Sequence, residues 1–258
     1  MTAAGLFDLT GQVAIVTGGS RGIGFQMARA LGQQGASLVL TARKAAELDA
    51  ARAELAAEGI RALTLVCDQS DPAAAGAITE AALTLTGRIE ILVNNAGTTW
   101  GAPAEDYPDE GWRKVMALNL DAVFTLSREV ARRAMLPQGY GRIVNIASVT
   151  GLTGNLLSME GTVAYNASKG GVISLTRAMA AEWGSRGVTV NAIAPGYFVS
   201  KMTKGTVDQH EAALLAHTPR GRLGAEQDLA GPVLLFASRA SDHITGQTLA
   251  VDGGYSAL

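Results

Sequence analysis

A tyrosine and a lysine four residues apart have the residue types and spacing of an acid–base pair. Tyr165 and Lys169 lie in the run Tyr-Asn-Ala-Ser-Lys, and Ser148 precedes them in the chain. Residues four positions apart on a helix share a face, so the ammonium group can favour the phenolate of a tyrosine whose ordinary pKa is about 10. Tyr165 would then be usable as an acid or a base near neutral pH.

A glycine-rich segment near the start of the chain predicts a phosphate-binding turn. The run Thr-Gly-Gly-Ser-Arg-Gly-Ile-Gly at 17–24 follows a short apolar segment and precedes one of helical period. Gly18, Gly22 and Gly24 would let the backbone turn sharply and approach a pyrophosphate, whose charge is favoured at a helix N-terminus. The other predicted contacts in this loop are Ser20, Arg21 and Ile23. Alone, such a loop is also an ordinary strand-to-helix connection, but with the tyrosine–lysine pair it predicts an oxidoreductase that binds a dinucleotide.

The residues after the second predicted strand indicate which dinucleotide is bound. Folds that prefer NAD place an acidic residue there to bind the ribose 2′-hydroxyl. This chain has Leu-Thr-Ala-Arg at 40–43, so no carboxylate repels a 2′-phosphate, and Arg43 can pair with one by charge-assisted hydrogen bonds. Arg21 supplies a second cation on the same side. The sequence therefore predicts NADP(H), although Arg43 and Lys44 would also suit a solvated helix start.

The elements that must position these residues form an alternating pattern. Short apolar runs alternate with longer segments of helical period, which predicts an α/β fold: a single doubly wound Rossmann-type domain over 1–258 with a seven-stranded parallel sheet flanked by helices. The strands are expected at 13–17, 37–41, 62–67, 89–93, 142–147, 189–193 and 248–251. The helices are expected at 22–34, 45–58, 72–86, 109–135, 163–185 and 226–238.

The least regular stretch, 197–222, follows the sixth expected strand and should contain a short helix near 203–216. Segments at the carboxyl edge of a parallel sheet commonly close over a ligand. We therefore interpret 197–222 as a substrate lid, with a long surface connection as the alternative.

The composition argues against several other classes of protein. A chain of 258 residues with 48% hydrophobic content can bury a sizeable core, and a net charge of -2 supplies no basic field for nucleic acid or an anionic membrane. Cys67 is the single cysteine, which excludes an internal disulfide and fits a reducing compartment. No apolar run has the length of a membrane span, so we expect a cytoplasmic protein. The histidines are scattered, which predicts no metal site; they are His210, His217 and His243.

Six motifs in this order resemble those of the short-chain dehydrogenase/reductase family along essentially the whole chain. They are the glycine loop, Asn94-Asn95-Ala96-Gly97, Asn119, Ser148, the Tyr165–Lys169 pair and Pro195-Gly196. The resemblance implies that Tyr165 exchanges a proton with a carbonyl or alcohol oxygen that Ser148 also binds. It implies that Lys169 holds the nicotinamide ribose and lowers the pKa of Tyr165. Asn119 would anchor a water in a proton relay, whereas its spacing alone favours a side chain that satisfies the helix backbone locally.

The resemblance also implies further cofactor contacts and an assembly. Asp68 would accept a hydrogen bond from the adenine amino group, and the residues lining the adenosine side would include Asn95, Ala96 and Gly97. The residues facing the nicotinamide end would be Pro195, Gly196, the backbone of Phe198, and Ser200, which stands where many members carry threonine. Such enzymes commonly form homotetramers through their long helices and last strand, here near 109–135, 163–185 and 249–255.

The features that bear on the choice of substrate point in different directions. The interval from Ser148 to Tyr165 is longer than usual in the family by about four residues, and the extra length lies in 151–160. The apolar side chains of this segment either rim the mouth of the site or pack on the protein's own surface. They are Leu156, Leu157 and Met159. Trp100 stands where gluconate-type members tend to be basic, and is either an apolar wall or a core residue.

Two subfamilies are equally similar to this chain. The segments 6–9, 194–198 and 251–254 look similar to gluconate 5-dehydrogenase-like members, while the general pattern is similar to 3-oxoacyl-carrier-protein reductases. We expect an NADP(H)-dependent enzyme that reduces a ketone or 3-oxoacyl-type small molecule. The alternatives are a sugar-acid oxidoreductase and, in another class, a catalytically silent NADP(H)-binding sensor or scaffold.

Overall fold

The computed structural model describes residues 2 and 4–258. Its centre is a parallel sheet of seven strands in the order β3-β2-β1-β4-β5-β6-β7. The strands are β1 (Val13–Thr17), β2 (Ser37–Ala42), β3 (Ala62–Val66), β4 (Ile91–Asn94), β5 (Gly141–Ile146), β6 (Val188–Pro195) and β7 (Thr248–Val251). The chain builds outward from β1 to β3 and then returns to place β4 on the other side of β1. The predicted doubly wound, single-domain α/β fold is confirmed, and its order reverses between β1 and β4, where such sheets bind ligands.

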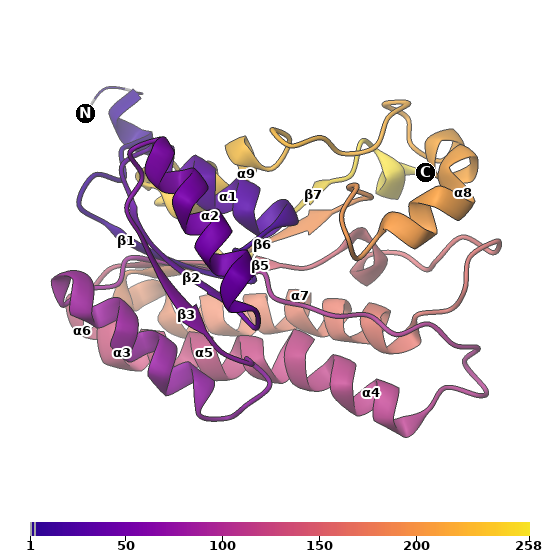
Figure 1. Cartoon of the computed structure of the whole chain (residues 1–258), viewed down its shortest axis with the longest axis horizontal. Helices are drawn as coiled ribbons and strands as arrows, with labels where there is room; N and C mark the ends of the chain where they lie inside the picture. Colours follow the sequence, from indigo (N-terminus) through magenta and orange to yellow (C-terminus); the bar gives the residue numbers. More distant parts are fainter. Residues whose placement is uncertain (1, 3) are drawn as a thin grey trace.

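Helices cover both faces of the sheet (Figure 1). One face carries α1 (Gly22–Gln33), α2 (Ala45–Ala57) and α9 (Ala230–Ala237). The other carries α3 (Ala74–Thr86), α4 (Asp109–Met116), α5 (Ala122–Val130), α6 (Leu136–Gln138) and α7 (Val163–Trp183). The helix α8 (Lys204–Ala216) lies apart from these layers, at the right of Figure 1 near the C-terminus.

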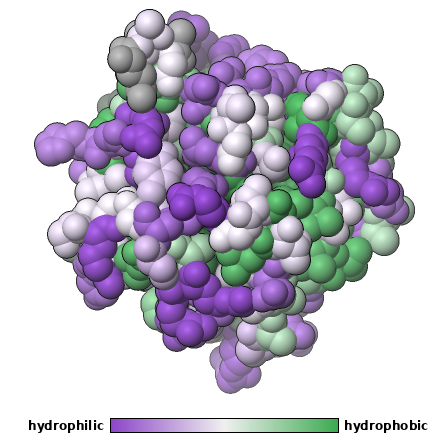
Figure 2. Space-filling model, turned by 90° about the vertical axis from the view of Figure 1, so that its left-hand side faces the viewer, coloured by the Kyte–Doolittle hydropathy of each residue, from purple (hydrophilic) through white to green (hydrophobic). Residues whose placement is uncertain are grey.

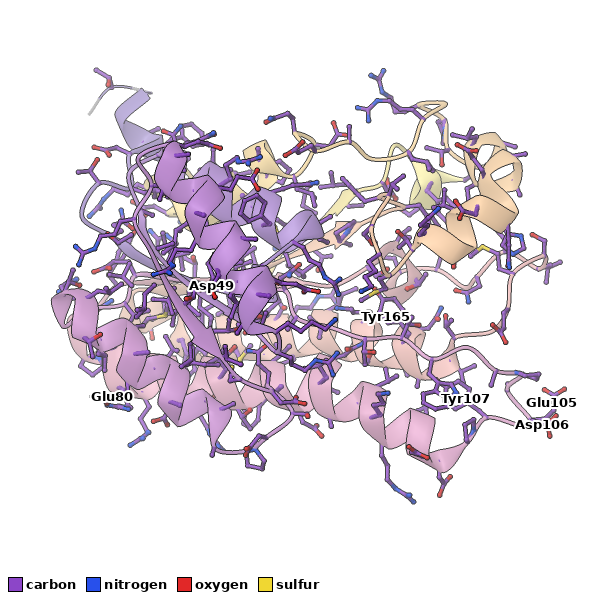
Figure 3. All side chains as sticks on the ribbon, viewed as in Figure 1. Asp49, Glu80, Glu105, Asp106, Tyr107 and Tyr165 are labelled. Atoms are coloured by element: carbon purple, nitrogen blue, oxygen red, sulfur yellow. The ribbon has the colours of Figure 1, made fainter. Side chains whose placement is uncertain are left out.

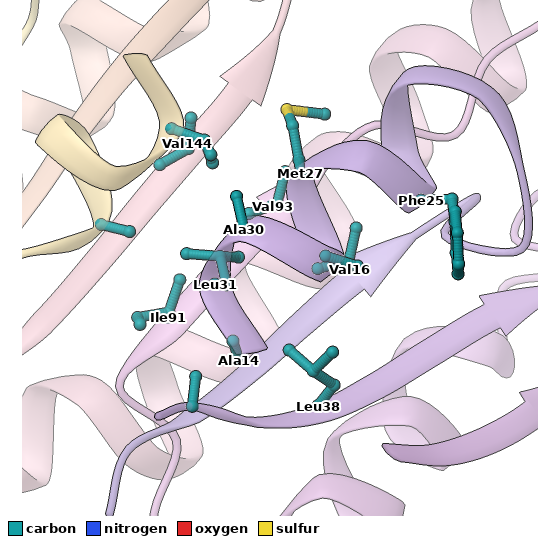
Figure 4. Packing of buried hydrophobic residues seen from close by; sticks show 14 of the residues in the cluster. Ala14, Val16, Phe25, Met27, Ala30, Leu31, Leu38, Ile91, Val93 and Val144 are labelled. Carbon is teal, nitrogen blue, oxygen red and sulfur yellow. The ribbon is translucent and has the colours of Figure 1, made fainter. Parts of the chain in front are cut away.

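Both faces of the sheet are buried, which explains the continuous apolar runs of its strands. Every residue of β1, β4, β5 and β6 is buried. Alternate side chains such as Val16 and Val93 pack against Leu31 of α1 (Figure 4), while Ile15 packs on the opposite face with Ile78 of α3. Each such side chain contributes roughly 1.5–3 kcal/mol when fully buried. The central strands therefore form a rigid platform for the loops at their carboxyl ends.

The long helix expected at 109–135 is interrupted by two π-helical turns. α4 and α5 are separated by residues Ala117–Asp121, and α5 and α6 by Ala131–Met135. Such turns insert a residue into the helical register and occur frequently at functional sites. The first of them contains Asn119.

Helix α9 begins at Ala230, whereas the sequence predicted a start near 226. Asp228 accepts hydrogen bonds from the Ala225 amide, at 2.8 Å, and from the Arg222 guanidinium, so this stretch forms a turn. Pro232 then falls in the first turn of the helix, where its missing N–H has no intrahelical partner to lose. The other predicted helix starts and the strand bounds agree with the structure to within two residues.

The outer surface mixes hydrophilic and hydrophobic side chains. Figure 2 shows the side of the molecule at the left of Figure 1, where hydrophilic residues cover much of the face and hydrophobic ones gather right of its centre. Among residues 2 and 4–258, no helix combines the length and apolar character needed to cross a bilayer.

Candidate active site

A cleft of about 460 Å³ opens at the carboxyl ends of the strands. This volume lies within the range of small-molecule sites. All the residues predicted to bind a cofactor line this cleft: Gly18, Ser20, Arg21, Gly22, Ile23, Gly24, Arg43, Asp68, Asn95, Ala96, Gly97, Tyr165, Lys169, Pro195, Gly196, Phe198 and Ser200. Ser148 lines it as well. The fold thus brings residues from most of the chain length to one edge of the sheet.

The glycine loop has the conformation that a phosphate cradle requires. Gly18 and Gly22 adopt positive φ values of 62° and 56°, which side-chain-bearing residues rarely do. A Cβ added at Gly24 would lie 2.3 Å from Asn95 Nδ2 and 2.4 Å from the Gly18 carbonyl oxygen, so only glycine fits there. Asn95 Nδ2 donates to the Thr17 carbonyl at 2.9 Å and fixes the loop against the segment after β4.

The N-terminus of α1 points its backbone donors at this cradle. The helix begins at Gly22, and its N-cap, Arg21, makes no side-chain capping bond. The first N–H groups of a helix have no intrahelical partner, and together with the helix dipole they favour an anion. The residues present therefore fit the pyrophosphate of a dinucleotide.

Two arginines at the cleft differ in whether a nearby carboxylate compensates their charge. Arg21 pairs with Glu47 at 3.4 Å, and Lys44 lies 3.6 Å from the same carboxylate, so the charge of Arg21 is partly compensated. Arg43 is exposed, and among the described residues no carboxylate lies within 4.0 Å of it. Of the two cations that the sequence offered for a 2′-phosphate, Arg43 is the better placed.

Asp68 lies just beyond the end of β3 with one oxygen already engaged. Its Oδ1 accepts hydrogen bonds from the Ser70 amide at 3.0 Å and the Ser70 hydroxyl at 2.7 Å. These bonds and, to a smaller extent, the charge of Arg43 hold the pKa of Asp68 below its ordinary value. Asp68 is thus an ionised acceptor at neutral pH on the wall of the cleft.

Tyr165 and Lys169 lie in the first two turns of α7, and Ser148 follows β5 as the N-cap of a short 3-10 turn, Val149–Gly151. Figure 3 shows Tyr165 inside the outline of the molecule, whereas Glu105 and Asp106 lie at its edge. Lys169 is only 4% exposed, and its Nζ donates to the Ile146 carbonyl at 2.7 Å. The same Nζ lies 5.6 Å from the centroid of the Tyr165 ring.

The expected lowering of the Tyr165 pKa by Lys169 is not what this structure shows. Burial raises the pKa of Tyr165, against a smaller lowering by its hydrogen bond with Ser148. Burial also lowers the pKa of Lys169 to about 8. Both shifts have one physical cause, because a low-dielectric surrounding disfavours the charged form of either group. The helical spacing predicted the pairing correctly but carried no information on burial.

Asn119 is fully buried in the π turn between α4 and α5. Its Oδ1 accepts from the Thr98 amide at 2.9 Å, and its Nδ2 donates to the Thr98 carbonyl at 2.9 Å and to Ser168 Oγ at 3.1 Å. Asn119 therefore links the segment after β4 to α7, and the alternative that it satisfies its own helix backbone is wrong. A Cβ at Gly97 would lie 3.3 Å from Asn119 Oδ1 and 3.7 Å from Lys169 Nζ, so these three residues meet.

The segment 151–160 borders the site, and its apolar residues divide between the two alternatives. Leu156 and Met159 pack in a cluster with Val149, Tyr197, Val207, Leu214, Leu223 and Tyr255, here called the mouth cluster. Leu157 instead is fully exposed. Val149 directly follows Ser148 and Tyr197 directly follows Gly196, so the mouth cluster adjoins the cleft that Ser148 and Gly196 line.

Trp100 packs on the protein and does not line the cleft. A Cβ added at Gly111 of α4 would lie 2.9 Å from Cδ2 of Trp100, and Lys114 Nζ lies 5.3 Å from the centroid of its ring. The packing alternative is therefore the one that the structure shows. Trp100 gives no support to an apolar substrate wall.

Sequence reasoning missed several residues at the site, and four of them have polar or adaptable side chains that bear on the chemistry. Lys201, Met202 and Thr203 line the cleft just before α8, and Thr150 hydrogen-bonds to Ser148. The Ser-Val-Thr spacing at 148–150 is a local signal for such a bond, since a serine side chain often binds the backbone two residues on. Within the described ranges, no three metal-ligating side chains cluster.

Comparisons with known proteins agree with this geometry. A family model described as enoyl-(acyl carrier protein) reductase matches residues 18–256. Gluconate 5-dehydrogenase of Gluconobacter oxydans is 42% identical over 256 residues, which cover 98% of each chain. The 3-oxoacyl-[acyl-carrier-protein] reductase of Escherichia coli is 40% identical over 96% of this chain and 98% of its own. The crystal structure of a gluconate 5-dehydrogenase from Burkholderia cenocepacia, in complex with NADP and tartrate, has a TM-score of 0.92 at 37% identity over 100% of both chains. This chain therefore belongs to the short-chain dehydrogenase/reductase family of oxidoreductases.

Proposed function

We propose that this protein is an NADP(H)-dependent oxidoreductase that interconverts a ketone and a secondary alcohol, and that it reduces ketone or 3-oxoacyl-type substrates. The observation that carries the proposal is the convergence, in one cleft, of a glycine cradle, an unpaired Arg43 and the Ser148–Tyr165–Lys169 group. The similarity to a solved relative in complex with NADP supports the choice of cofactor.

The residues of the cleft could hold the cofactor at several points. The N–H groups at the start of α1 would bind the pyrophosphate, and Arg43 would pair with the 2′-phosphate. Asp68 would accept from the adenine amino group, and Lys169 would donate to the nicotinamide ribose. The residues that would hold the nicotinamide end are Pro195, Gly196, Phe198 and Ser200. When bound, NADPH supplies the hydride for reduction, and NADP⁺ takes it up in the reverse direction.

In reduction, Tyr165 would give its phenolic proton to the carbonyl oxygen of the substrate. Ser148 donates a hydrogen bond to the same oxygen and orients it. The raised pKa of Tyr165 keeps the phenol protonated at neutral pH, which is the form that a reduction needs. Lys169, whose pKa is about 8, returns a proton to the phenolate, and Asn119 would anchor the water through which Lys169 recovers that proton.

The mouth cluster favours a substrate with an apolar or acyl substituent. Leu156, Met159 and Tyr197 place apolar surface next to the part of the cleft that Ser148 and Gly196 line. We further propose that 197–222 acts as the lid, since Val207 and Leu214 of α8 belong to the mouth cluster.

A sugar acid is the second candidate substrate. Two relatives named gluconate 5-dehydrogenase resemble the chain over nearly its whole length, and Lys201 on the cleft wall is a cation that a carboxylate would need. The catalytically silent alternative keeps little support, because every proposed catalytic position is present. Cofactor binding without turnover on any carbonyl or alcohol would favour it.

The test is a panel assay of NADPH oxidation by the purified protein. The panel contains 3-oxoacyl thioesters, simple and aryl ketones, diketones and 5-keto sugar acids. Turnover of the apolar or acyl members supports the proposal. A preference for the keto sugar acid, lost on Lys201→Gln, would establish the second candidate instead.

We also propose a homotetramer built on the long helices and the last strand. Trp112 of α4, Phe124 of α5 and Leu249 of β7 are exposed large apolar side chains that such an assembly would cover. Light scattering at micromolar concentration should give four times the 26.6 kDa chain mass. A monomeric mass would contradict this assembly.

Replacing Arg43 by alanine should weaken NADPH binding by about 10- to 100-fold and leave NADH binding nearly unchanged. The loss corresponds to a charge-assisted hydrogen bond of roughly 1.5–3 kcal/mol, which NADH cannot make. The dissociation constants of both nucleotides, measured by fluorescence titration, check this. Lys44→Ala is the matched control, because this neighbouring cation already faces Glu47. Equal losses for NADPH and NADH would contradict a role at the 2′-phosphate.

A further inference from the structure

Within the described residues, both hydrogen bonds that the Ser148 hydroxyl accepts come from Thr150. Ser148 Oγ accepts from the Thr150 amide at 3.2 Å and from Thr150 Oγ1 at 2.9 Å. Both residues are buried, with 8% and 9% of their surface exposed. In the part of the chain that the structure describes, Thr150 Oγ1 makes no other hydrogen bond. Its hydroxyl proton is thus directed at Ser148.

A hydroxyl group has one proton to donate and two lone pairs that accept. The two Thr150 donors occupy both lone pairs of Ser148 Oγ. The remaining direction around the oxygen is that of its own O–H bond, which therefore points away from Thr150. Ser148 and Tyr165 both line the cleft in which the substrate oxygen would lie.

The turn that carries Thr150 is fixed in place. Ser148, as N-cap, begins the 3-10 turn, and Gly151 closes it against α7 at Lys169. A Cβ at Gly151 would lie 2.7 Å from the Lys169 carbonyl carbon, so the backbone of the turn touches the helix that carries Tyr165. The Thr150 hydroxyl consequently sits at a defined distance from the reacting groups.

We propose that Thr150 is a positioning residue that fixes the direction of the Ser148 O–H bond, so that Ser148 donates to the substrate oxygen instead of accepting from it. The inference rests on the proposed function, in which Ser148 and Tyr165 bind one carbonyl or alcohol oxygen. Without the Thr150 hydroxyl, one lone pair of Ser148 is free, and the O–H bond can rotate to arrangements that compete with the productive one.

The test compares Thr150→Val, which keeps the shape and the backbone donor, with Thr150→Ser, which also keeps the hydroxyl. Thr150→Val should lower kcat about tenfold, the size of one hydrogen bond, with little change in KM or in NADPH affinity. Thr150→Ser should behave like the wild type in all of these measurements.

A second measurement separates positioning from mere structural support. In a Ser148→Ala background the Thr150→Val change should have almost no further effect on kcat, because the two residues act through one bond. An equal loss in both backgrounds, or an equal loss in Thr150→Val and Thr150→Ser, would overturn the inference, as would a wild-type rate in Thr150→Val. Inactivity of the wild type on the whole panel, in contrast, would defeat the proposed function itself.

Discussion

Replacing Tyr165 by phenylalanine should reduce kcat by about 100- to 10,000-fold, the usual contribution of a positioned general acid. The substitution removes one oxygen atom and leaves the ring, which lies 5.6 Å from the Lys169 ammonium. NADPH should bind with nearly wild-type affinity, since the glycine cradle and Arg43 are untouched. A loss confined to kcat would identify an interaction that matters in the transition state.

The measurement is the rate of NADPH oxidation with the best substrate of the panel, together with an NADPH titration of each protein. Tyr107→Phe is a matched control, because the Tyr107 hydroxyl donates to the Trp100 carbonyl at 3.0 Å and does not line the cleft. It should retain turnover. Wild-type rates in Tyr165→Phe would remove the proposed acid from the mechanism.

The strands and the membership of the cleft follow from local sequence for a physical reason. A parallel strand buried on both faces must be almost wholly apolar, so β1 and β4 stand out as short Val/Ile/Leu runs. The carboxyl ends of parallel strands meet at one edge of the sheet. Residues that directly follow these runs, such as Gly18 and Asn95, were therefore predictable neighbours although they are far apart in the sequence.

Features set by tertiary packing were not predictable in the same way. The π turn at Asn119 depends on partners at Thr98 and Ser168, and helical periodicity carries no trace of them. The Trp100 ring packs against α4 because Gly111, which has no side chain, leaves space for it there. Charge spacing alone likewise predicted a lowered pKa for Tyr165, whereas burial raises it in the cofactor-free structure.

The same burial leads to the second large effect, at Lys169. Replacing Lys169 by methionine should make the cofactor-free protein more stable at pH 7 while it removes most of the activity. The pKa of Lys169 is lowered from its ordinary 10.5 to about 8, so the folded protein resists the charge that the unfolded chain carries freely. Between pH 8 and 10.5 the unfolded state binds more protons, so this residue makes wild-type stability rise with pH across that window. Below pH 8 Lys169 is charged in both the folded and the unfolded state, so the free-energy cost of burying this charge is fully present. Its removal is expected to raise the free energy of unfolding of the variant by up to about 3 kcal/mol.

Chemical denaturation of both proteins without cofactor, at pH 7 and at pH 10, checks this prediction. The stability difference between Lys169→Met and the wild type should shrink at pH 10, where Lys169 is neutral in the folded state. Lys44→Met is the control, and its stability relative to the wild type should not depend on pH in this way because Lys44 is exposed. Lower stability of Lys169→Met at pH 7 would mean that the bond to the Ile146 carbonyl outweighs burial. The expected gain has a functional explanation in the proposed mechanism: an ammonium group held away from water is destabilising in the free protein, yet it would hold a ribose hydroxyl and return a proton to Tyr165. On this proposal the protein keeps an unfavourable lysine because the reaction requires it.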